Sequence, residues 1–233
     1  MRYLILLLSL FQVATSQAQS ITAKQLLDKA IAFHDPNGNW KIFDGEFKVL
    51  MKSPNSSDRL STITLNAPKQ HFDLLVQKDG DSYGYHLGKE CGTHLNGSPE
   101  ISDEDRKKYK LTCERGETMK NYYTYLYGLP MKLKDPGTIL DDKVQKKTIR
   151  GKEYLVLKVT YEKGVGSDVW YFYFDPKTYA MEVYQFYHDE SKNDGEYILL
   201  EGLEDINGIK MPKTRAWHVN KDNKYLGTDI LEK

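Results

Sequence analysis

The sequence predicts a mainly β (α+β) fold, in which antiparallel strands make one sheet and helices lie against it. Apolar and polar residues alternate along many short segments, and this alternation has the period of a β-strand. Turn pairs such as Asp79-Gly80 and Asn207-Gly208 separate these segments and favour tight hairpins. Helical spacing or a helix start signal occurs in only a few places. We count about eleven strands and roughly three helices.

The first residues, MRYLILLLSLFQVATSQA, have the pattern of a secretory signal peptide. Arg2 supplies the positive charge, and residues 4–13 form an apolar stretch that is too short to span a bilayer. We expect residues 1–18 to be removed and residues 19–233 to form a single domain, since no linker or repeat interrupts them. Gln19 rather than a cysteine follows the cut. The expected product is therefore a soluble periplasmic protein with no lipid anchor and no transmembrane segment.

Composition and charge argue against some classes of partner. Lys+Arg and Asp+Glu number 33 each, so the formal net charge is zero. A nucleic-acid-binding surface needs a basic excess, and so does a general attraction to anionic membranes. The 17 Tyr, 8 Phe and 3 Trp instead supply a large amphipathic surface. We expect no cofactor.

The N-terminal half begins with a helix and continues as strands. Thr22 and Gln25 form the pattern of a capping box, and Asp35-Pro36 ends the helix near His34. Alternation then predicts strands over residues 43–52, 60–65, 70–77 and 82–87. Residues 88–97 are rich in glycine and are expected to be irregular.

Two further helices are predicted before the C-terminal half. Ser102 can begin a short helix whose first turn is acidic. In the segment 113–133, apolar side chains recur at helical spacing, and Gly128 is expected to end the helix in a left-handed conformation. Most of this apolar stripe should pack on the sheet. A functional interpretation is that part of it borders a ligand cavity, through Tyr122, Leu126, Leu129 and Met131.

The two cysteines, Cys91 and Cys113, leave two alternatives open. In an oxidising compartment they could form a disulfide, which would close a loop of about 20 residues and add roughly 3 kcal/mol of stability. The sequence alone does not show whether they meet. With His86 and His94 they could also be taken for a metal cluster, but the spacing fits no standard zinc pattern. We therefore predict no metal site.

The C-terminal half is predicted as a continuous antiparallel meander. Its strands are expected over residues 144–149, 154–161, 169–174, 181–187, 197–206, 209–219 and 224–231. Pro212 cannot donate a ladder hydrogen bond, so it predicts an edge or a bulge.

The hairpin of residues 169–188, VWYFYFDPKTYAMEVYQFYH, is the most informative stretch. Asp175-Pro176 is turn chemistry, and both flanking strands carry aromatic residues on both faces. Alternation places Met181, Val183, Gln185 and Tyr187 on one face of the second strand. One face of the hairpin should pack in the core while the other lines something apolar. We select as ligand-binding the face that carries Trp170, Phe172, Phe174, Tyr184 and Phe186.

Three segments resemble a family of exported, uncharacterised Bacteroidota proteins: YLYGLPMKLKDPGT (residues 125–138), FDPKTYAMEVYQFYH (174–188) and EGLEDINGIKMPKTRAW (201–217). That family is similar in layout to the lipoprotein-localisation carriers LolA and LolB. The resemblance implies an unclosed antiparallel β-barrel of about eleven strands, with helices covering the concave face. It also implies an acyl chain bound in the hollow. No residue here matches the carriers' functional arginine, so no such role is transferred.

The expected function is binding of a hydrophobic ligand, a lipid or an acyl chain, as in a lipid or lipoprotein carrier. An alternative is a periplasmic protein–protein interaction module without a ligand, which would use the unpaired edges of the sheet or a partner at the outer membrane. Catalysis is not expected, since the sequence has no Gly-x-Ser-x-Gly, His-Glu-x-x-His or phosphate-loop motif. Among the candidate acids Asp175, Glu182 and Glu201, Asp175 is better explained by its turn. Exposed carboxylates in a chain with 28% charged residues usually form a solvated face.

Overall fold

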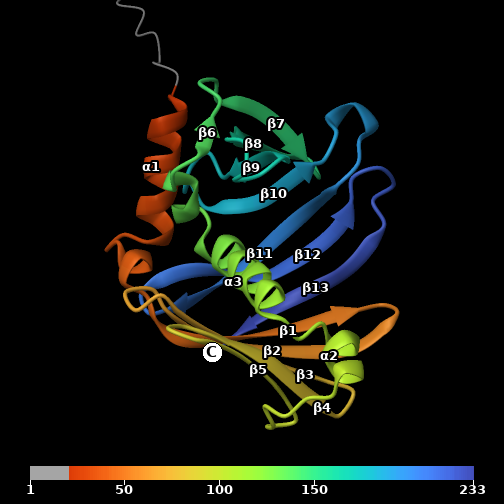
Figure 1. Ribbon diagram of the computed structural model, residues 1–233. Coiled ribbons are helices and arrows are strands. Elements are labelled where there is room, and N and C mark those ends of the chain that lie inside the picture. The colour runs from red at the N-terminus through yellow and green to blue at the C-terminus, as the bar shows by residue number, and fades with distance from the viewer. Residues whose placement is uncertain (1–20) are drawn as a thin grey trace, which may run out of the picture.

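The structure, a computed structural model, describes residues 21–233 and consists mainly of one antiparallel sheet (Figure 1). The predicted signal peptide lies outside the described residues. The sheet has thirteen strands, so the prediction of about eleven was too low. In chain order they are β1 (Asp44–Ser53), β2 (Ser56–Asn66), β3 (His71–Lys78), β4 (Asp81–Leu87), β5 (Cys91–Leu95), β6 (Thr138–Leu140), β7 (Gln145–Ile149), β8 (Lys152–Tyr161), β9 (Val169–Phe174), β10 (Met181–Tyr187), β11 (Glu196–Ile206), β12 (Ile209–Val219) and β13 (Tyr225–Glu232).

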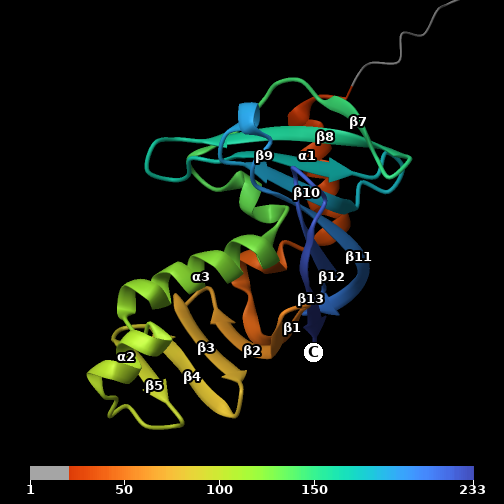
Figure 2. The same cartoon turned by 90° about the vertical axis from the view of Figure 1, so that its right-hand side faces the viewer.

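The sheet is not closed into a barrel. Its order is β5-β4-β3-β2-β1-β13-β12-β11-β10-β9-β8-β6, and β7 pairs with β8 on the same side as β6. Strands β1–β5 make one wing and β7–β10 the other, while β11–β13 connect them (Figures 1 and 2). This confirms the unclosed, mainly β fold.

The three α-helices of the described chain are α1 (Ala23–His34), α2 (Asp103–Tyr109) and α3 (Cys113–Gly128). Short 3₁₀ helices occupy η1 (Asn39–Ile42), η2 (Met131–Lys134) and η3 (Glu190–Lys192). Figure 2 shows α3 lying across the wing that contains β2–β4, and α1 packs against the other part of the sheet. None of these helices is long and apolar enough to span a bilayer.

Local sequence explains where the helices begin. Thr22 Oγ1 accepts the backbone N–H of Gln25, and the Gln25 side chain accepts the N–H of Thr22, so the predicted capping box forms. Ser102 and Thr112 cap α2 and α3 in the same way. Side-chain capping therefore fixes the start of every α-helix in the described residues.

Gly128 does not end α3 in a left-handed conformation, so that prediction was wrong. It is the last helical residue, and Leu129 leaves the helix with an extended backbone. A Cβ on Gly128 would lie 2.3 Å from Cζ2 of Trp40. Glycine is needed here because the Trp40 indole packs directly against the helix backbone.

Two strands were missed by the sequence analysis. Residues 88–97 were expected to be irregular, yet they contain β5, which pairs with β4 through Gly84↔His94 and Leu87↔Cys91. The three-residue strand β6 pairs with the end of β8. Neither strand has a clear apolar alternation, and both are defined by backbone pairing at the edges of the sheet.

The Cys91–Cys113 disulfide is present, with the two Cα atoms 6.1 Å apart. It links β5 to the first residue of α3. The bridge therefore attaches the N-terminal end of the covering helix to the edge of the sheet.

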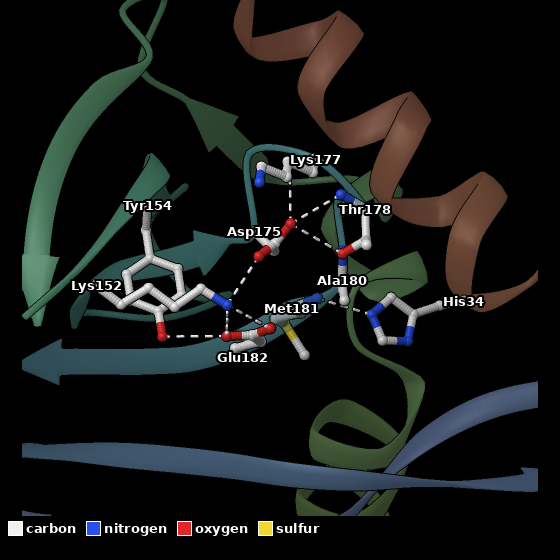
Figure 3. Close-up of polar contacts among 9 residues, drawn as sticks. All are labelled: His34, Lys152, Tyr154, Asp175, Lys177, Thr178, Ala180, Met181 and Glu182. Atoms are coloured by element: carbon white, nitrogen blue, oxygen red, sulfur yellow. Dashed lines mark hydrogen bonds and ion pairs between the residues drawn. The ribbon is translucent and has the colours of Figure 1, made fainter. Parts of the chain in front are cut away.

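The prediction for the faces of β10 was wrong for Met181. The register shifts between Met181 and Val183, since Met181 pairs with Phe174 and Val183 pairs with Tyr173. This bulge places Met181 in the main core with Phe174, whereas Val183 lies on the opposite face. Figure 3 shows the Met181 N–H donating to Nε2 of His34, at 2.9 Å.

The turn before the bulge is held by an ionic cluster (Figure 3). Asp175 Oδ1 accepts the backbone N–H groups of Lys177 and Thr178, as the turn prediction required. Lys152 Nζ lies 2.8 Å from Asp175 and 2.7 Å from Glu182. Hydrogen bonds from Lys152 and the turn hold the pKa of the Asp175 carboxyl well below its usual range, even though burial opposes this. These acids stabilise the hairpin.

Pro212 lies on β12, between β11 and β13. Pairing with β13 covers only Thr214 to His218, so Pro212 is beyond the paired part of that side. Because β12 is an interior strand and its register shift lies at Trp217/His218, the prediction of an edge or a bulge at Pro212 was wrong.

Candidate ligand-binding site

The helix-facing side of the sheet carries the main core. Tyr123, Leu126 and Tyr127 of α3 are buried against it. Tyr127 stacks near Phe47 of β1, with ring centroids 4.9 Å apart. Helical spacing predicts one apolar stripe of Met119, Tyr122, Tyr123 and Leu126. The buried stripe is shifted from this one, because Met119 and Tyr122 remain only partly buried at its border.

Two clefts open on either side of Tyr122. The first has a volume of about 460 Å³ and lies between α3, the segment around η2, the loop from β8 to β9, and Trp170. The second, of about 290 Å³, lies between Tyr122 and the strands that join the wings. Its lining is largely apolar and comprises Met51, Tyr122, Glu196, Trp217, Leu226, Gly227 and Asp229.

A row of aromatic rings connects the two clefts. Trp170 lies 4.8 Å from Phe186 and 6.1 Å from Tyr184 between ring centroids. Tyr184 in turn lies 6.2 Å from Trp217. On the helix side, Tyr125 packs edge-on to Trp170 at 5.5 Å. We call the partly buried members of this surface the aromatic groove: Tyr122, Tyr125, Trp170, Phe186 and Trp217.

Polar groups lie at the first cleft. The Tyr125 and Tyr161 hydroxyls are hydrogen-bonded to each other, and burial raises the pKa of Tyr161 to about 12. Two charged residues, Lys132 and Asp168, also line this cleft. Lys132 forms an ion pair with Asp135. Asp168 accepts from His188 Nδ1 at 2.8 Å, and this hydrogen bond raises the pKa of His188. The first cleft is therefore suited to a polar or charged group.

The second cleft has walls of low polarity. Burial raises the pKa of Asp229 and of Glu196, which shows that their charged forms are poorly solvated there. Trp217 Nε1 donates to Asp229 Oδ2 at 3.0 Å, and this bond fixes the indole against the cleft. The second cleft therefore favours an apolar group over a charged one.

A buried arginine lies beneath α3. The Arg215 guanidinium is stacked on the Tyr127 ring, 3.9 Å from the centroid. Its Nη1 donates to the Pro212 carbonyl at 2.9 Å. Within residues 21–233, Arg215 Nε and the hydroxyls of Tyr127 and Tyr184 have no hydrogen-bond partner. This polar centre lies under the groove and does not line either cleft.

The structure separates the residues selected from the sequence into two groups. Tyr122 and Trp170 line clefts, and Phe186 and Met131 are partly buried beside them. The others are packed inside the core: Leu126, Leu129, Phe172, Phe174 and Tyr184. The selected face of the hairpin is the one that meets the helices, since Trp170 contacts Tyr125 of α3.

Sequence reasoning did not select two members of the groove, Tyr125 and Trp217. Trp217 has the same parity on β12 as the buried Ile209 and Met211, so alternation could have placed it on the inner face. Tyr125 lies in the helix predicted within residues 113–133, where it and Tyr127 extend the apolar stripe, but helical spacing alone does not show which flank of the helix stays open.

Comparisons with known proteins identify a family and a fold. The family described as "Family of unknown function (DUF6503)" matches residues 1–232. No curated protein sequence matches the chain.

A LolA superfamily protein from Nitrosomonas europaea is similar in structure, with a TM-score of 0.51 and 12% identity over 92% of this chain and 93% of that one. A putative outer membrane lipoprotein-sorting protein domain from Vibrio parahaemolyticus gives a TM-score of 0.46 and 13% identity, over 89% and 88% of the two chains. A DUF1329 family protein from Desulfovibrio piger gives a TM-score of 0.48 and 12% identity, over 90% of each.

Proposed function

We propose that this chain, which belongs to the DUF6503 family of unknown function, binds a lipid or an acyl chain in the aromatic groove beside α3. The observation that carries the proposal is the set of partly buried aromatic rings beside the two clefts, which the fully buried Tyr184 joins into one row at the border of an otherwise well-packed core. Apolar surface left partly open in this way gains free energy when a ligand covers it.

The difference between the clefts suggests an orientation for the ligand. The apolar tail lies in the second cleft, between Met51, Trp217 and Leu226, and the polar head lies near Lys132 and Asp168 in the first. Each buried CH₂ contributes about 0.8 kcal/mol, so a tail segment of about eight carbons contributes roughly 6 kcal/mol. That free energy is enough for reversible binding.

The carrier role is the finer part of the proposal. It is supported by the fold shared with the LolA superfamily protein and by the signal peptide expected from the sequence, which would place the chain in the periplasm. A carrier takes up its cargo from one partner and releases it to another, and a groove along the flank of one helix is open enough for such exchange.

Catalysis is not part of the proposal. The acids singled out from the sequence have structural partners: Asp175 and Glu182 bind Lys152 in the hairpin cluster. Glu201 is exposed and pairs in the β11–β12 ladder.

Native mass spectrometry tests ligand binding directly. The chain is purified from its natural host without detergent, and the bound material is extracted with solvent. We expect a near-stoichiometric lipid or acylated peptide. A clean apo mass, together with no uptake of a fluorescent fatty-acid probe, would contradict the proposal. Trp170→Ala and Trp217→Ala should each weaken probe binding about tenfold, which corresponds to about 1.4 kcal/mol of lost contact.

The free edges of the sheet favour a second candidate function, that of a protein-interaction module. Strand β6 is an edge strand, and its Ile139 side chain is exposed. If the purified protein carries no lipid, a pull-down that compares the wild-type chain with Ile139→Lys tests this function. A partner that binds the β6 edge should be captured by the wild-type chain and lost with Ile139→Lys.

A further inference from the structure

Three metal-binding side chains meet on the outer face of the wing formed by β1–β5, away from the helices. Phe72 and Leu74 of β3 point into the core, so His71 and Asp73 point outward. His86 of β4 lies directly opposite Asp73 in the ladder. The pleat and the strand pairing therefore place His71 and Asp73 of β3 beside His86 of β4.

Asp73 lies between the two imidazoles. Its Oδ2 is 2.6 Å from Nε2 of His71, and its Oδ1 is 2.6 Å from Nδ1 of His86. The two rings are 4.9 Å apart between centroids, and one donor atom from each of the three residues falls within 4.8 Å of the others. A carboxylate and two ring nitrogens thus converge on one point.

The surroundings leave room for an ion. A Cβ on Gly88 would lie 3.3 Å from Nδ1 of His71 and 3.8 Å from Nε2 of His86, which are the ring nitrogens that do not contact Asp73, so glycine avoids crowding the two rings from that side. The side chains of His71, Asp73 and His86 are 29%, 38% and 52% exposed, which lets an ion enter from solvent. Exposed ion pairs of this kind add little stability, so the cluster is not explained by the fold.

We propose that His71, Asp73 and His86 bind a divalent transition-metal ion, with Zn²⁺ as the first choice. Imidazole and carboxylate are preferred ligands of Zn²⁺, and both also suit Cu²⁺, Ni²⁺ and Fe²⁺. Ligand bonds of about 2.1 Å in tetrahedral geometry need donor separations of about 3.4 Å. The two 2.6 Å contacts of Asp73 therefore open by about 0.8 Å when the ion enters, and the remaining separation, which is at most 4.8 Å, closes by up to about 1.4 Å. Three protein ligands leave a coordination position for water or for a group from another molecule. This inference does not depend on the proposed lipid binding.

The chain contains a matched control. His188 also pairs with an aspartate, Asp168, at 2.8 Å and is 63% exposed, but no second imidazole belongs to that pair among the described residues. If an isolated His–Asp pair were enough to bind the metal ion, the ion would bind at both places. If all three ligands are needed, the ion binds only at His71, Asp73 and His86.

The experiment uses untagged chain, stripped with a chelator, dialysed and titrated with ZnCl₂ by calorimetry and with CoCl₂ by visible absorption. We expect one site per chain, Co²⁺ bands in the visible, and a Tm that rises with Zn²⁺. His71→Ala and His86→Ala should each weaken Zn²⁺ binding about tenfold or more, Asp73→Asn should do so as well, and His188→Ala should leave it unchanged. Affinity should fall at acidic pH, because only the unprotonated imidazole binds a metal.

Three results would overturn the inference. The first is the absence of saturable Zn²⁺ or Co²⁺ binding. The second is equal weakening by His188→Ala and His86→Ala. The third is wild-type affinity in both His71→Ala and His86→Ala. Because none of the three side chains is buried in the core, these variants should fold, and circular dichroism of each variant verifies this.

Discussion

At the scale of single residues, His34 shows how one buried side chain connects distant segments. Its Nε2 accepts the Met181 N–H, so its proton is on Nδ1, which donates to the Lys210 carbonyl at 2.6 Å. The ring therefore joins α1 to the bulge of β10 and to β12. It is fully buried, and burial lowers its pKa to about 4.

His34 gives the fold an acid sensitivity whose direction follows from linkage. The pKa of His34 in the folded chain is about 4 and the ordinary pKa of histidine is 6.5, so the unfolded chain binds more protons between these two pH values. The stabilisation is complete above the unfolded pKa and is lost as the pH falls from 6.5 towards 4. We expect a loss of about 3 kcal/mol from this group over that interval.

The measurement is urea unfolding of wild type and His34→Gln at pH 7 and pH 4. The glutamine does not titrate, so the variant should lose about 3 kcal/mol less than wild type on acidification. Its stability at pH 7 should be lower, because the two hydrogen bonds are disturbed. Equal losses in both proteins would show that His34 is not the titrating group.

At the scale of elements, α3 is fixed at both ends by contacts that helical periodicity does not reveal. At the C-terminal end, the Trp40 ring occupies the space where Gly128 would carry a side chain. Gly128→Ala should therefore destabilise the chain by about 1–3 kcal/mol through overpacking, although alanine is the better helix former. Thermal unfolding checks this, with the exposed Thr118→Ala on the same helix as control. A stabilised Gly128→Ala protein would refute the contact.

At the N-terminal end, the disulfide attaches α3 to β5. The two cysteines are 22 residues apart, so removing the bridge in Cys91→Ser/Cys113→Ser should lower the free energy of unfolding by about 3 kcal/mol. Hydrogen exchange should increase mainly in β5 and at the start of α3. Reductant should destabilise wild type and leave the double variant unaffected. A double variant as stable as wild type would mean that packing alone holds this end.

Elements with strong local signals were predictable from the sequence, and elements defined by pairing were not. The capping box of α1, the hairpin turns and the alternating strands of the C-terminal half depend on neighbours in the chain, so their pattern is visible in the sequence. Strands β5 and β6 exist because an edge offers unpaired backbone groups. The bulge at Met181 depends on His34, which lies 147 residues away.

The candidate site shows the same division. The sequence indicated which hairpin and which helix carry the aromatic surface, because both have an excess of Tyr, Phe and Trp. It did not indicate which side chains stay partly open. Phe172 is fully buried while Trp170 lines a cleft, although both share one face of one strand. That difference depends on how far α3 covers the inner face of the sheet, and this is a property of tertiary packing.

At the scale of the whole molecule, one open sheet carries two distinct surfaces. The helix-covered side has the aromatic groove, and the outer face of the β1–β5 wing has the His71, Asp73 and His86 cluster. Because the sheet does not close, α3 covers the inner face only in part, and some aromatic rings stay partly open at the border of the core. The architecture thus explains why a core this rich in aromatic residues has a groove at its border.

Quenching of tryptophan fluorescence by a brominated fatty acid tests the central claim most directly. Bromine quenches only nearby indoles, and the chain has three: Trp170 and Trp217 in the groove, and Trp40 packed against the end of α3. We expect saturable quenching that persists in Trp40→Phe and is nearly abolished in Trp170→Phe/Trp217→Phe. Absence of quenching in wild type, or full quenching in the double variant, would contradict ligand binding in the aromatic groove.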